Sequence, residues 1–381
     1  MFVVDGIISK NIPSQIDIKA INIQAIHDLF AYRFYIHGDT PISNVKIFNP
    51  YSYEDFLPSF HEHRSIDLIR IHNLIMNQLK PLLGQKVDIL FSGGIDSTYL
   101  ALCLLELETD VRAINIKYKG YDESYQAADA AAKLDIPIKI IELSEHDIIN
   151  ELPNVVRELG VPYDRGSVVP LYFLIKQSGE NIVAGDSADA VFLPSMKSHF
   201  KCIQEGQSPW TLEKDVDELN KIFDKPIFRK LQPVPLSSTI DEMLYIEIFH
   251  EIPYYYRHRY MQFVKSDQKI FLPFQDADVL KEACRQKGLH VITNPAKIYL
   301  RILASHISRG HLSDLSILMN PKNAFKIEPE FYDIVADKFL DLSIVHELGI
   351  FNKTLDPWKL IPWHRWLLTL FSIWLKEMVF K

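Results

Sequence analysis

The residues best suited to chemistry lie where an apolar segment, Val87–Phe91, runs into the sequence Ser-Gly-Gly-Ile-Asp-Ser-Thr at 92–98. Two adjacent glycines let the backbone turn tightly and come close to a ligand. If a helix begins after them, its first N–H groups and its dipole favour an anion. This order of strand, glycine turn and helix predicts a binding site for a group of the size of pyrophosphate.

Side chains of this loop add to the predicted site. Its hydroxyl groups can donate hydrogen bonds to phosphate oxygens, and an acid beside phosphates can hold Mg²⁺. The loop lacks G-x-x-x-x-G-K-[ST] and G-x-G-x-x-G, which excludes a Walker A loop and a dinucleotide fingerprint. The phosphate-binding candidates are Ser92, Gly93, Gly94, Asp96, Ser97 and Thr98, with Asp96 also as a metal ligand.

The segments around the loop alternate between strand and helix patterns. Strands are predicted at Val87–Phe91, Val111–Ile116, Ile136–Ile141 and Asn181–Ala184, and helices at Thr98–Glu108, Glu123–Leu134 and Glu145–Leu159. Such alternation is typical of a parallel sheet with helices on both faces. We therefore predict an α/β fold with a doubly wound parallel sheet.

The flanking segments have other patterns. Residues 1–60 indicate short strands with one helix near Ile23–Tyr35, and apolar spacing predicts a helix over 64–80. Residues 210–381 have mainly helical periodicity. The charges within Trp363–Phe380 favour an amphipathic closing helix over a membrane span. We expect a small N-terminal α+β region at 1–84 and a larger α/β domain at 85–381.

Composition limits the class of partner. The 41 basic and 49 acidic residues give a formal net charge of −8, which argues against nucleic-acid binding. Cys103, Cys202 and Cys284 lack metal-binding spacing, and no signal-peptide pattern is visible, so we expect reduced thiols in a cytoplasmic protein. His61-Glu62-His63 lacks the spacing of H-E-x-x-H, so we assign it no metal. The composition leaves homodimer formation open.

Residues 92–97 match the S-G-G-x-D-S loop of the N-type ATP pyrophosphatases, also called PP-loop enzymes. Later segments resemble the asparagine synthetase branch of these enzymes. Ile182–Phe192 resembles a strand followed by S-G-E-G-x-D-E-x-F, and Phe271–Asp276 resembles R-x-P-F-L-D. Lys297–Arg301 is similar to K-x-x-L-R, and Pro321–Phe325 to a K-x-x-F segment. The segments occur in the order found in the family.

The resemblance implies a fold of the adenine-nucleotide alpha-hydrolase type, with ATP and Mg²⁺ as cofactors. It implies a ligase that adenylates a carboxylate, releases pyrophosphate and forms an amide when ammonia or an amine displaces AMP. It further implies metal binding by Asp96 and Asp189, charge stabilisation by Lys297 and Lys322, and backbone contacts to adenine from Ile116 and Gly185.

Several positions depart from the family pattern. Asp186 stands where the family has Glu, Ala190 replaces the last Glu of that motif, and Phe271 replaces the Arg of R-x-P-F-L-D. Lys269 stands where a cyclising relative would carry an acid. This difference favours a linear amide over a ring as the product.

The N-terminal sequence bears on the nitrogen source. A glutaminase domain of this family begins with a nucleophilic Cys, whereas Phe2 follows Met1 here. We therefore expect no functional glutaminase at 1–84. Ammonia, an amine-bearing substrate or a separate amidotransferase would then supply the nitrogen.

Two other interpretations stay open. The adenylated group could be a carbonyl oxygen, as in nucleotide or tRNA modification, although no C-x-x-C supports this. The chain could instead be an ATP-binding regulatory subunit without activity, which Ala190 and Lys269 favour and the intact loop disfavours. The run Tyr254–Arg259 is aromatic and basic, as a nucleic-acid patch can be. The resemblance implies a helix near the acceptor site for this stretch, which favours packing or substrate contact over nucleic-acid binding.

Overall fold

The computed structural model describes residues 1–32, 35–118, 121–163, 166–192, 216–227, 229, 238–290, 296–308, 314–320 and 329–380. Its central sheet contains parallel strands in the order β7-β5-β4-β8-β9. These strands are β4 (Lys86–Leu90), β5 (Asp110–Tyr118), β7 (Ile138–Leu143), β8 (Asn181–Val183) and β9 (Lys269–Phe271). A short strand, β6 (Tyr121–Asp122), pairs antiparallel with the end of β5. The predicted parallel sheet is confirmed.

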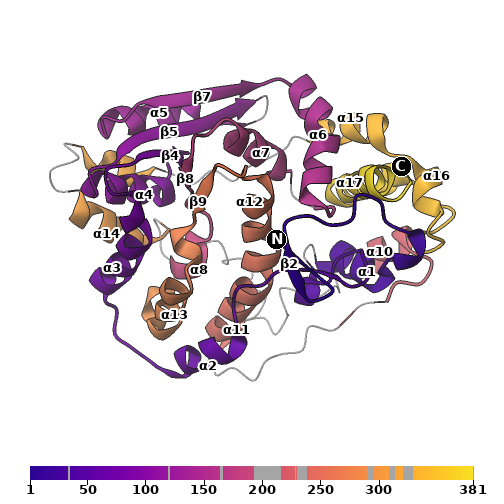
Figure 1. Ribbon diagram of the computed structural model, residues 1–381, viewed down its shortest axis with the longest axis horizontal. Helices are drawn as coiled ribbons and strands as arrows, with labels where there is room; N and C mark the ends of the chain where they lie inside the picture. Colours follow the sequence, from indigo (N-terminus) through magenta and orange to yellow (C-terminus); the bar gives the residue numbers. More distant parts are fainter. Residues whose placement is uncertain are drawn as a thin grey trace.

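After β4, the chain first adds strands on one side of β4 and later adds strands on its other side. It moves through β5 to β7, then passes to β8 beside β4 and finally to β9. The strands are joined by helices that lie over the sheet (Figure 1), including α4 (Ile95–Glu106), α5 (Ser124–Lys133), α6 (Glu145–Leu159) and α7 (Val168–Lys176). The strand order therefore reverses between β4 and β8, and open α/β sheets bind ligands beyond the carboxyl ends of strands at such a point.

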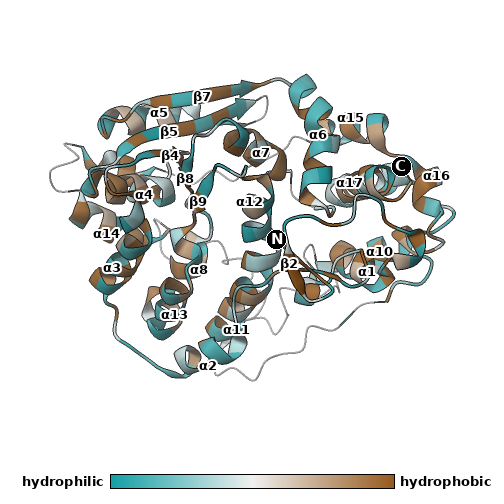
Figure 2. Ribbon diagram, in the orientation of Figure 1, coloured by the Kyte–Doolittle hydropathy of each residue, from teal (hydrophilic) through white to brown (hydrophobic). Residues whose placement is uncertain are grey.

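Two hydrophobic clusters cover the opposite faces of the sheet. On β5, Ala113 joins one cluster and Ile114 and Ile116 join the other, as the alternation of side chains along a strand requires. On β8, Ile182 and Val183 divide in the same way. Most helices carry hydrophilic and hydrophobic residues side by side (Figure 2), as expected for helices with one face in a core. The doubly wound arrangement is thus confirmed.

The first cluster, which contains Ala113 and Val183, includes residues of α14 (Ile298–Ile307) that pack against α4. The same face of the sheet is covered by α3 (Leu68–Leu79), α8 (Ala188–Phe192), α11 (Thr239–Ile246) and α13 (Ala277–Arg285). Because α14 packs along α4, residues at the start of α14 lie beside the loop at 92–97. Packing on this face therefore joins two segments that are about 200 residues apart in sequence.

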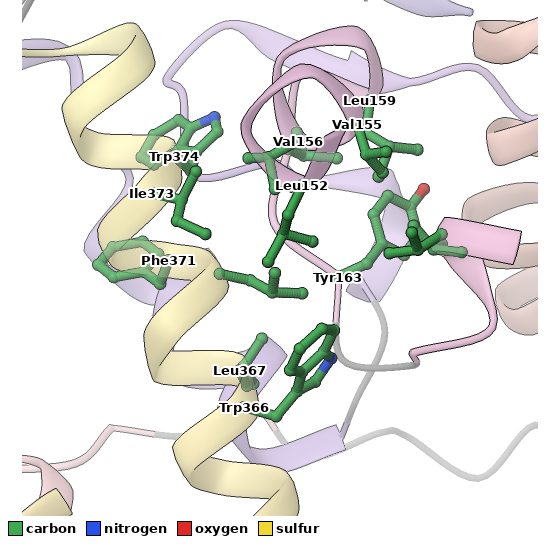
Figure 3. Packing of buried hydrophobic residues seen from close by; sticks show 14 of the residues in the cluster. Leu152, Val155, Val156, Leu159, Tyr163, Trp366, Leu367, Phe371, Ile373 and Trp374 are labelled. Atoms are coloured by element: carbon green, nitrogen blue, oxygen red, sulfur yellow. The ribbon is translucent and has the colours of Figure 1, made fainter. Parts of the chain in front are cut away.

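The second cluster is built around α17 (Pro362–Met378), which packs against α6, α15 (Pro329–Phe339) and α16 (Leu342–His346). Figure 3 shows Trp374 and Ile373 of α17 beside Val156 and Leu152 of α6. The predicted closing helix is present, but its predicted amphipathic character is wrong, because every residue from 364 to 375 is buried. Some polar atoms in this run find partners inside the protein: the His364 ring contacts the Phe30 carbonyl at 3.2 Å, and the Thr369 hydroxyl donates to the Arg365 carbonyl at 2.8 Å.

The N-terminal residues share both clusters with the rest of the chain. An antiparallel sheet has the order β2-β1-β3, formed by β1 (Phe2–Val4), β2 (Ile7–Ser9) and β3 (Val45–Ile47), and it is followed by α2 (Tyr53–His61). Phe2 packs into the cluster of α17, together with Phe30 of α1 (Ile23–Tyr32), whereas Phe56 and Phe60 pack into the cluster of α14. The domain boundary at residue 84 stays a prediction.

The remaining described elements are mostly helical, as predicted for the C-terminal part. They are α10 (Val216–Ile222), the π-helix η5 (Glu247–Arg257), α12 (His258–Phe263), and the 3-10 turns η1 (Ile18–Ala20), η2 (Ile36–Gly38), η3 (Lys80–Leu82), η6 (Pro273–Gln275), η7 (Lys287–Leu289), η8 (Leu315–Met319) and η9 (Pro357–Lys359). The sequence pattern does not predict α2, α7 or β9. Within the part of the chain that the structure describes, no helix has the length and apolar character needed to cross a membrane.

Replacing Trp374 tests the packing of α17. Its side chain is fully buried, and its indole N–H donates to the Gly160 carbonyl at 2.8 Å. We expect Trp374→Ala to lower the free energy of unfolding by about 3–5 kcal/mol, because it leaves a cavity and an unpaired carbonyl. Trp358→Ala, at a half-exposed tryptophan, is the matched control and should cost no more than about 1 kcal/mol. Equal losses in urea denaturation would contradict this packing.

Candidate active site

A cavity of about 300 Å³ lies at the carboxyl ends of β4, β5 and β8, where the strand order reverses. Three segments after these strands contribute to its walls: the loop at 92–97, the end of β5 at 114–116, and residues 184–189. A fourth wall comes from η5 and α12 through Glu247, Tyr256, Arg259 and Tyr260. The cavity thus lies where the topology of the sheet predicts a ligand.

The loop after β4 has the turn that its glycines predict. Gly93 has φ +71°, and a Cβ there would meet the Gln126 carbonyl oxygen at 2.6 Å. Gly94 precedes the first residue of α4, and the Ser97 hydroxyl donates to its carbonyl at 3.1 Å. The helix begins at Ile95 rather than at the predicted Thr98. Asp96 therefore lies in the first turn, where helical N–H groups lack intrahelical partners and favour an anion.

Asp96 and Asp189 are held together by one ammonium group. The Lys297 Nζ lies 2.6 Å from both Asp96 carboxylate oxygens and 2.8 Å from an Asp189 oxygen. Lys297 is only 2% exposed and precedes α14 in a left-handed conformation, with φ 58°. A cation therefore fits between these two carboxylates.

The donor set also fits Mg²⁺. This ion commonly takes one or two protein carboxylates and completes its shell with water and substrate phosphates. Among the residues with described placement, no group of three or more His, Cys, Asp or Glu side chains could form a full metal cage. Two carboxylates beside a phosphate-binding loop suit an ion that arrives with a polyphosphate.

The far wall of the cavity carries a second charged group. The Arg259 guanidinium donates to Asp186 at 2.6 Å, and the Tyr260 hydroxyl donates to the same carboxylate oxygen at 2.6 Å. Burial raises the pKa of Tyr260, so its hydroxyl stays protonated at neutral pH. Burial alone lowers the pKa of Arg259, but nearby Tyr255 and Asp186 raise it overall. Asp186 is thus an oriented carboxylate that faces the cavity.

An unusual helix positions this wall. Residues Glu247–Arg257 form the π-helix η5, and short π-helical segments often mark functional sites. Glu247 at its start and Tyr256 near its end both line the cavity. The rings of Tyr255, Tyr256 and Tyr260 lie 4.9–5.6 Å from the Arg259 guanidinium, within cation–π range. Aromatic packing therefore fixes the arginine that orients Asp186.

The opposite wall is mainly apolar. This part of the lining is formed by Ile114 and Ile116 of β5 and by Leu171 and Leu174 of α7, a surface suited to a flat, weakly polar ring. The segment after β8 lies close to the loop, since a Cβ on Gly185 would be in ordinary van der Waals contact with the Asp96 backbone at 3.4 Å. Both residues that the resemblance assigns to adenine, Ile116 and Gly185, line the cavity.

The structure brings together most residues predicted from the sequence. The residues that line the cavity are Ser92, Gly94, Asp96, Ser97, Ile116, Gly185 and Asp189, and Lys297 joins them through its ion pairs. Gly93 and Thr98 do not line it; Thr98 is fully buried behind the loop. Lys322 lies outside the described residues, as do the other residues of the predicted K-x-x-F segment. The individual roles of these residues stay predictions.

Sequence reasoning does not assign roles to Glu247, Tyr260 or the Arg259–Asp186 pair. The aromatic and basic run 254–259 is a signal for part of this wall, and a substrate contact is one of its predicted uses. Tyr256 and Arg259 do line the cavity. The pairing itself joins residues 73 positions apart in sequence, and local patterns carry no information on such a contact.

The parallel sheet and the loop at its switch point define an α/β nucleotide-binding type of fold. Residues 84–210 match the model of the family described as asparagine synthase. The curated relative "Asparagine synthetase [glutamine-hydrolyzing] 1" of Bacillus subtilis (strain 168) is 28% identical over 106 residues, which cover 26% of this chain and 17% of that protein. The predicted resemblance to asparagine synthetases is thus confirmed over a segment that contains the loop and Asp189.

Two solved structures are more distantly similar. A predicted subunit of a tRNA methyltransferase from Methanocaldococcus jannaschii is 14% identical, with a TM-score of 0.23, over 62% of this chain and 94% of that one. NMN synthetase from Francisella tularensis is 10% identical, with a TM-score of 0.26, over 69% of this chain and 100% of that one. The fold assignment rests on the strand order and on the asparagine synthase match.

The two loop glycines give a matched pair of variants. Gly93 has a positive φ and no room for a Cβ, whereas Gly94 has φ −78° and only the Ser92 hydroxyl within 4 Å of an added Cβ. We expect Gly93→Ala to lower the free energy of unfolding by about 2 kcal/mol or more, and Gly94→Ala to change it by less than about 1 kcal/mol. Thermal denaturation measures both. The described loop geometry is wrong if the two variants are equally stable.

Proposed function

We propose that this chain is an AMP-forming ligase that adenylates a carboxylate with ATP and joins it to ammonia or an amine. The strongest support is that one cavity is lined by the Ser-Gly-Gly loop and by Asp96 and Asp189, whose carboxylates both pair with the Lys297 ammonium. The asparagine synthase match covers the loop and both carboxylates. Lys297 lies beyond the matched residues and adds an independent observation.

In the proposed first step, an oxygen of the substrate carboxylate attacks the α-phosphorus of ATP and pyrophosphate leaves. The N–H groups at the start of α4 would hold the leaving phosphates, and the apolar wall with Ile116 would hold adenine. Asp96 and Asp189 would hold Mg²⁺, which when bound neutralises charge on the phosphates. Lys297 would add a further positive charge. The main contribution of these residues is position and charge stabilisation.

In the proposed second step, a nitrogen attacks the acyl carbon and AMP leaves. Asp186 is the proposed proton acceptor, because Arg259 and Tyr260 hold one of its oxygens in place while the residue lines the cavity. It would take a proton from the attacking nitrogen as the amide forms. Ser167 is also on this wall and accepts a hydrogen bond from Arg259 at 3.1 Å.

We further propose a small-molecule or peptide carboxylate as the substrate. Nitrogen would come from ammonia, an amine or a separate amidotransferase, and the product would be a linear amide. Lys269 does not line the cavity; its side chain is 68% exposed and pairs with Glu180 at 3.6 Å. It therefore supplies no charged group to the cavity, which Asp186 does line.

The proposed reaction predicts which bond of ATP breaks. Purified protein with Mg²⁺, ATP labelled in the α- and γ-phosphates, and a panel of carboxylates with ammonia should release AMP and pyrophosphate. Release should require one of the carboxylates, because the carboxylate is the attacking group. A panel of free nucleosides and tRNA serves as the comparison. ADP with orthophosphate as products, or AMP release that depends on tRNA alone, would contradict the proposal.

Two aspartates should separate the two proposed steps. Asp96→Asn should lower carboxylate-dependent exchange of labelled pyrophosphate into ATP by about 100-fold or more, since it removes a charge at the phosphates. Asp186→Asn should leave this exchange within a few-fold of the original and slow amide formation by about 100-fold or more. Asp55→Asn, at an exposed residue of α2, is the control. Loss of exchange in both site variants would show that the roles are not divided in this way.

A further inference from the structure

We infer that Lys297 is a built-in substitute for the metal ion, so that the site accepts a divalent cation only together with a polyphosphate. The Lys297 ammonium sits between the two carboxylates that would hold the ion, at 2.6 Å from Asp96 and 2.8 Å from Asp189. The inference rests on the proposed function for the identity of the polyphosphate as ATP.

Two carboxylates this close need a positive charge between them. Buried charges are strongly disfavoured unless they are paired, and Lys297 is 2% exposed. A divalent cation at the same carboxylate oxygens would be repelled by the Lys297 ammonium, which already forms ion pairs with Asp96 and Asp189. Metal binding without nucleotide must therefore displace Lys297 from both of its carboxylate partners.

The backbone at Lys297 indicates that the ion pairs define its position. A residue other than glycine in the left-handed region, at φ 58° and ψ 45°, pays a conformational penalty that its surroundings must offset. The left-handed turn aims the side chain at the start of α4 rather than along α14. Three short contacts to two carboxylates supply the offsetting interaction.

A polyphosphate with its own divalent cation removes the conflict. The ion takes the two carboxylates, and the ammonium gains phosphate oxygens as its new partners. Cation and nucleotide should then bind with strong positive coupling, while either one alone binds weakly. Such an exchange also keeps the carboxylate pair neutralised in both states of the enzyme.

Binding of Mn²⁺, read from its electron paramagnetic resonance signal, tests the exchange without any turnover. In the absence of nucleotide, Lys297→Met should bind Mn²⁺ at least about 10-fold more tightly than the wild-type protein, a typical size for coupling between ligands. Lys269→Met, at an exposed lysine, is the matched control and should behave as the wild type. With α,β-methylene-ATP present, the wild type should bind Mn²⁺ as tightly as Lys297→Met does.

A second readout guards against a folding defect. Mn²⁺ should raise the melting temperature of Lys297→Met and leave that of the nucleotide-free wild type unchanged, and Asp189→Asn added to Lys297→Met should abolish the effect. Lys297→Gln, which keeps hydrogen-bond donors but no charge, replaces Lys297→Met if the latter does not fold. Tight Mn²⁺ binding by the nucleotide-free wild type, or no gain in the folded lysine variants, overturns the inference. The nucleotide-free measurements stand even if ATP is not the nucleotide, whereas failure of the proposed function appears as absence of AMP formation.

Discussion

The site depends on one electrostatic constraint: two carboxylates from different strand ends must share a positive charge. Asp96 follows β4 and Asp189 follows β8, and the sheet places these strands side by side where its order reverses. The Lys297 ammonium compensates both acids in the described state. Because breaking a buried pair leaves an uncompensated charge, the starts of α4, α8 and α14 are held in one arrangement. The glycine loop can then present its N–H groups to a ligand at a fixed distance from these charges.

Hydrophobic packing keeps those three helix starts in place. One cluster holds α4, α8 and α14 on one face of the sheet, and the other presses α6, α7 and α17 on the opposite face. The second cluster also holds Tyr255 and Tyr260, whose rings surround Arg259 and thereby orient Asp186. The carboxylate pair and the Arg259–Asp186 pair are thus supported by packing on different faces of the sheet.

Local sequence predicts the loop and the sheet well, because both follow from neighbouring residues. A strand, two glycines and a helix start fix the turn at 92–97, and the alternation of patterns from residue 86 to 184 fixes the parallel strands. Long-range contacts are not predictable in this way: Lys297 meets Asp96 about 200 residues away, and Arg259 meets Asp186, which is 73 residues away. Strand β9 has only three residues, which is too short for a recognisable pattern. The burial of α17 is not predicted, because polar residues such as His364 contact buried partners that lie far away in the sequence. Asp189 and Lys297 come instead from the resemblance to asparagine synthetases.

We propose that the loop, the two carboxylates and Lys297 form one site for Mg²⁺ and the polyphosphate of ATP. A crystal structure with α,β-methylene-ATP and Mg²⁺ would test this proposal. We expect the phosphates against the start of α4, adenine against Ile116, the ion on Asp96 and Asp189, and the Lys297 ammonium moved from the carboxylates to a phosphate. A nucleotide bound elsewhere, or Lys297 unmoved between the two aspartates with the ion at other ligands, would contradict it.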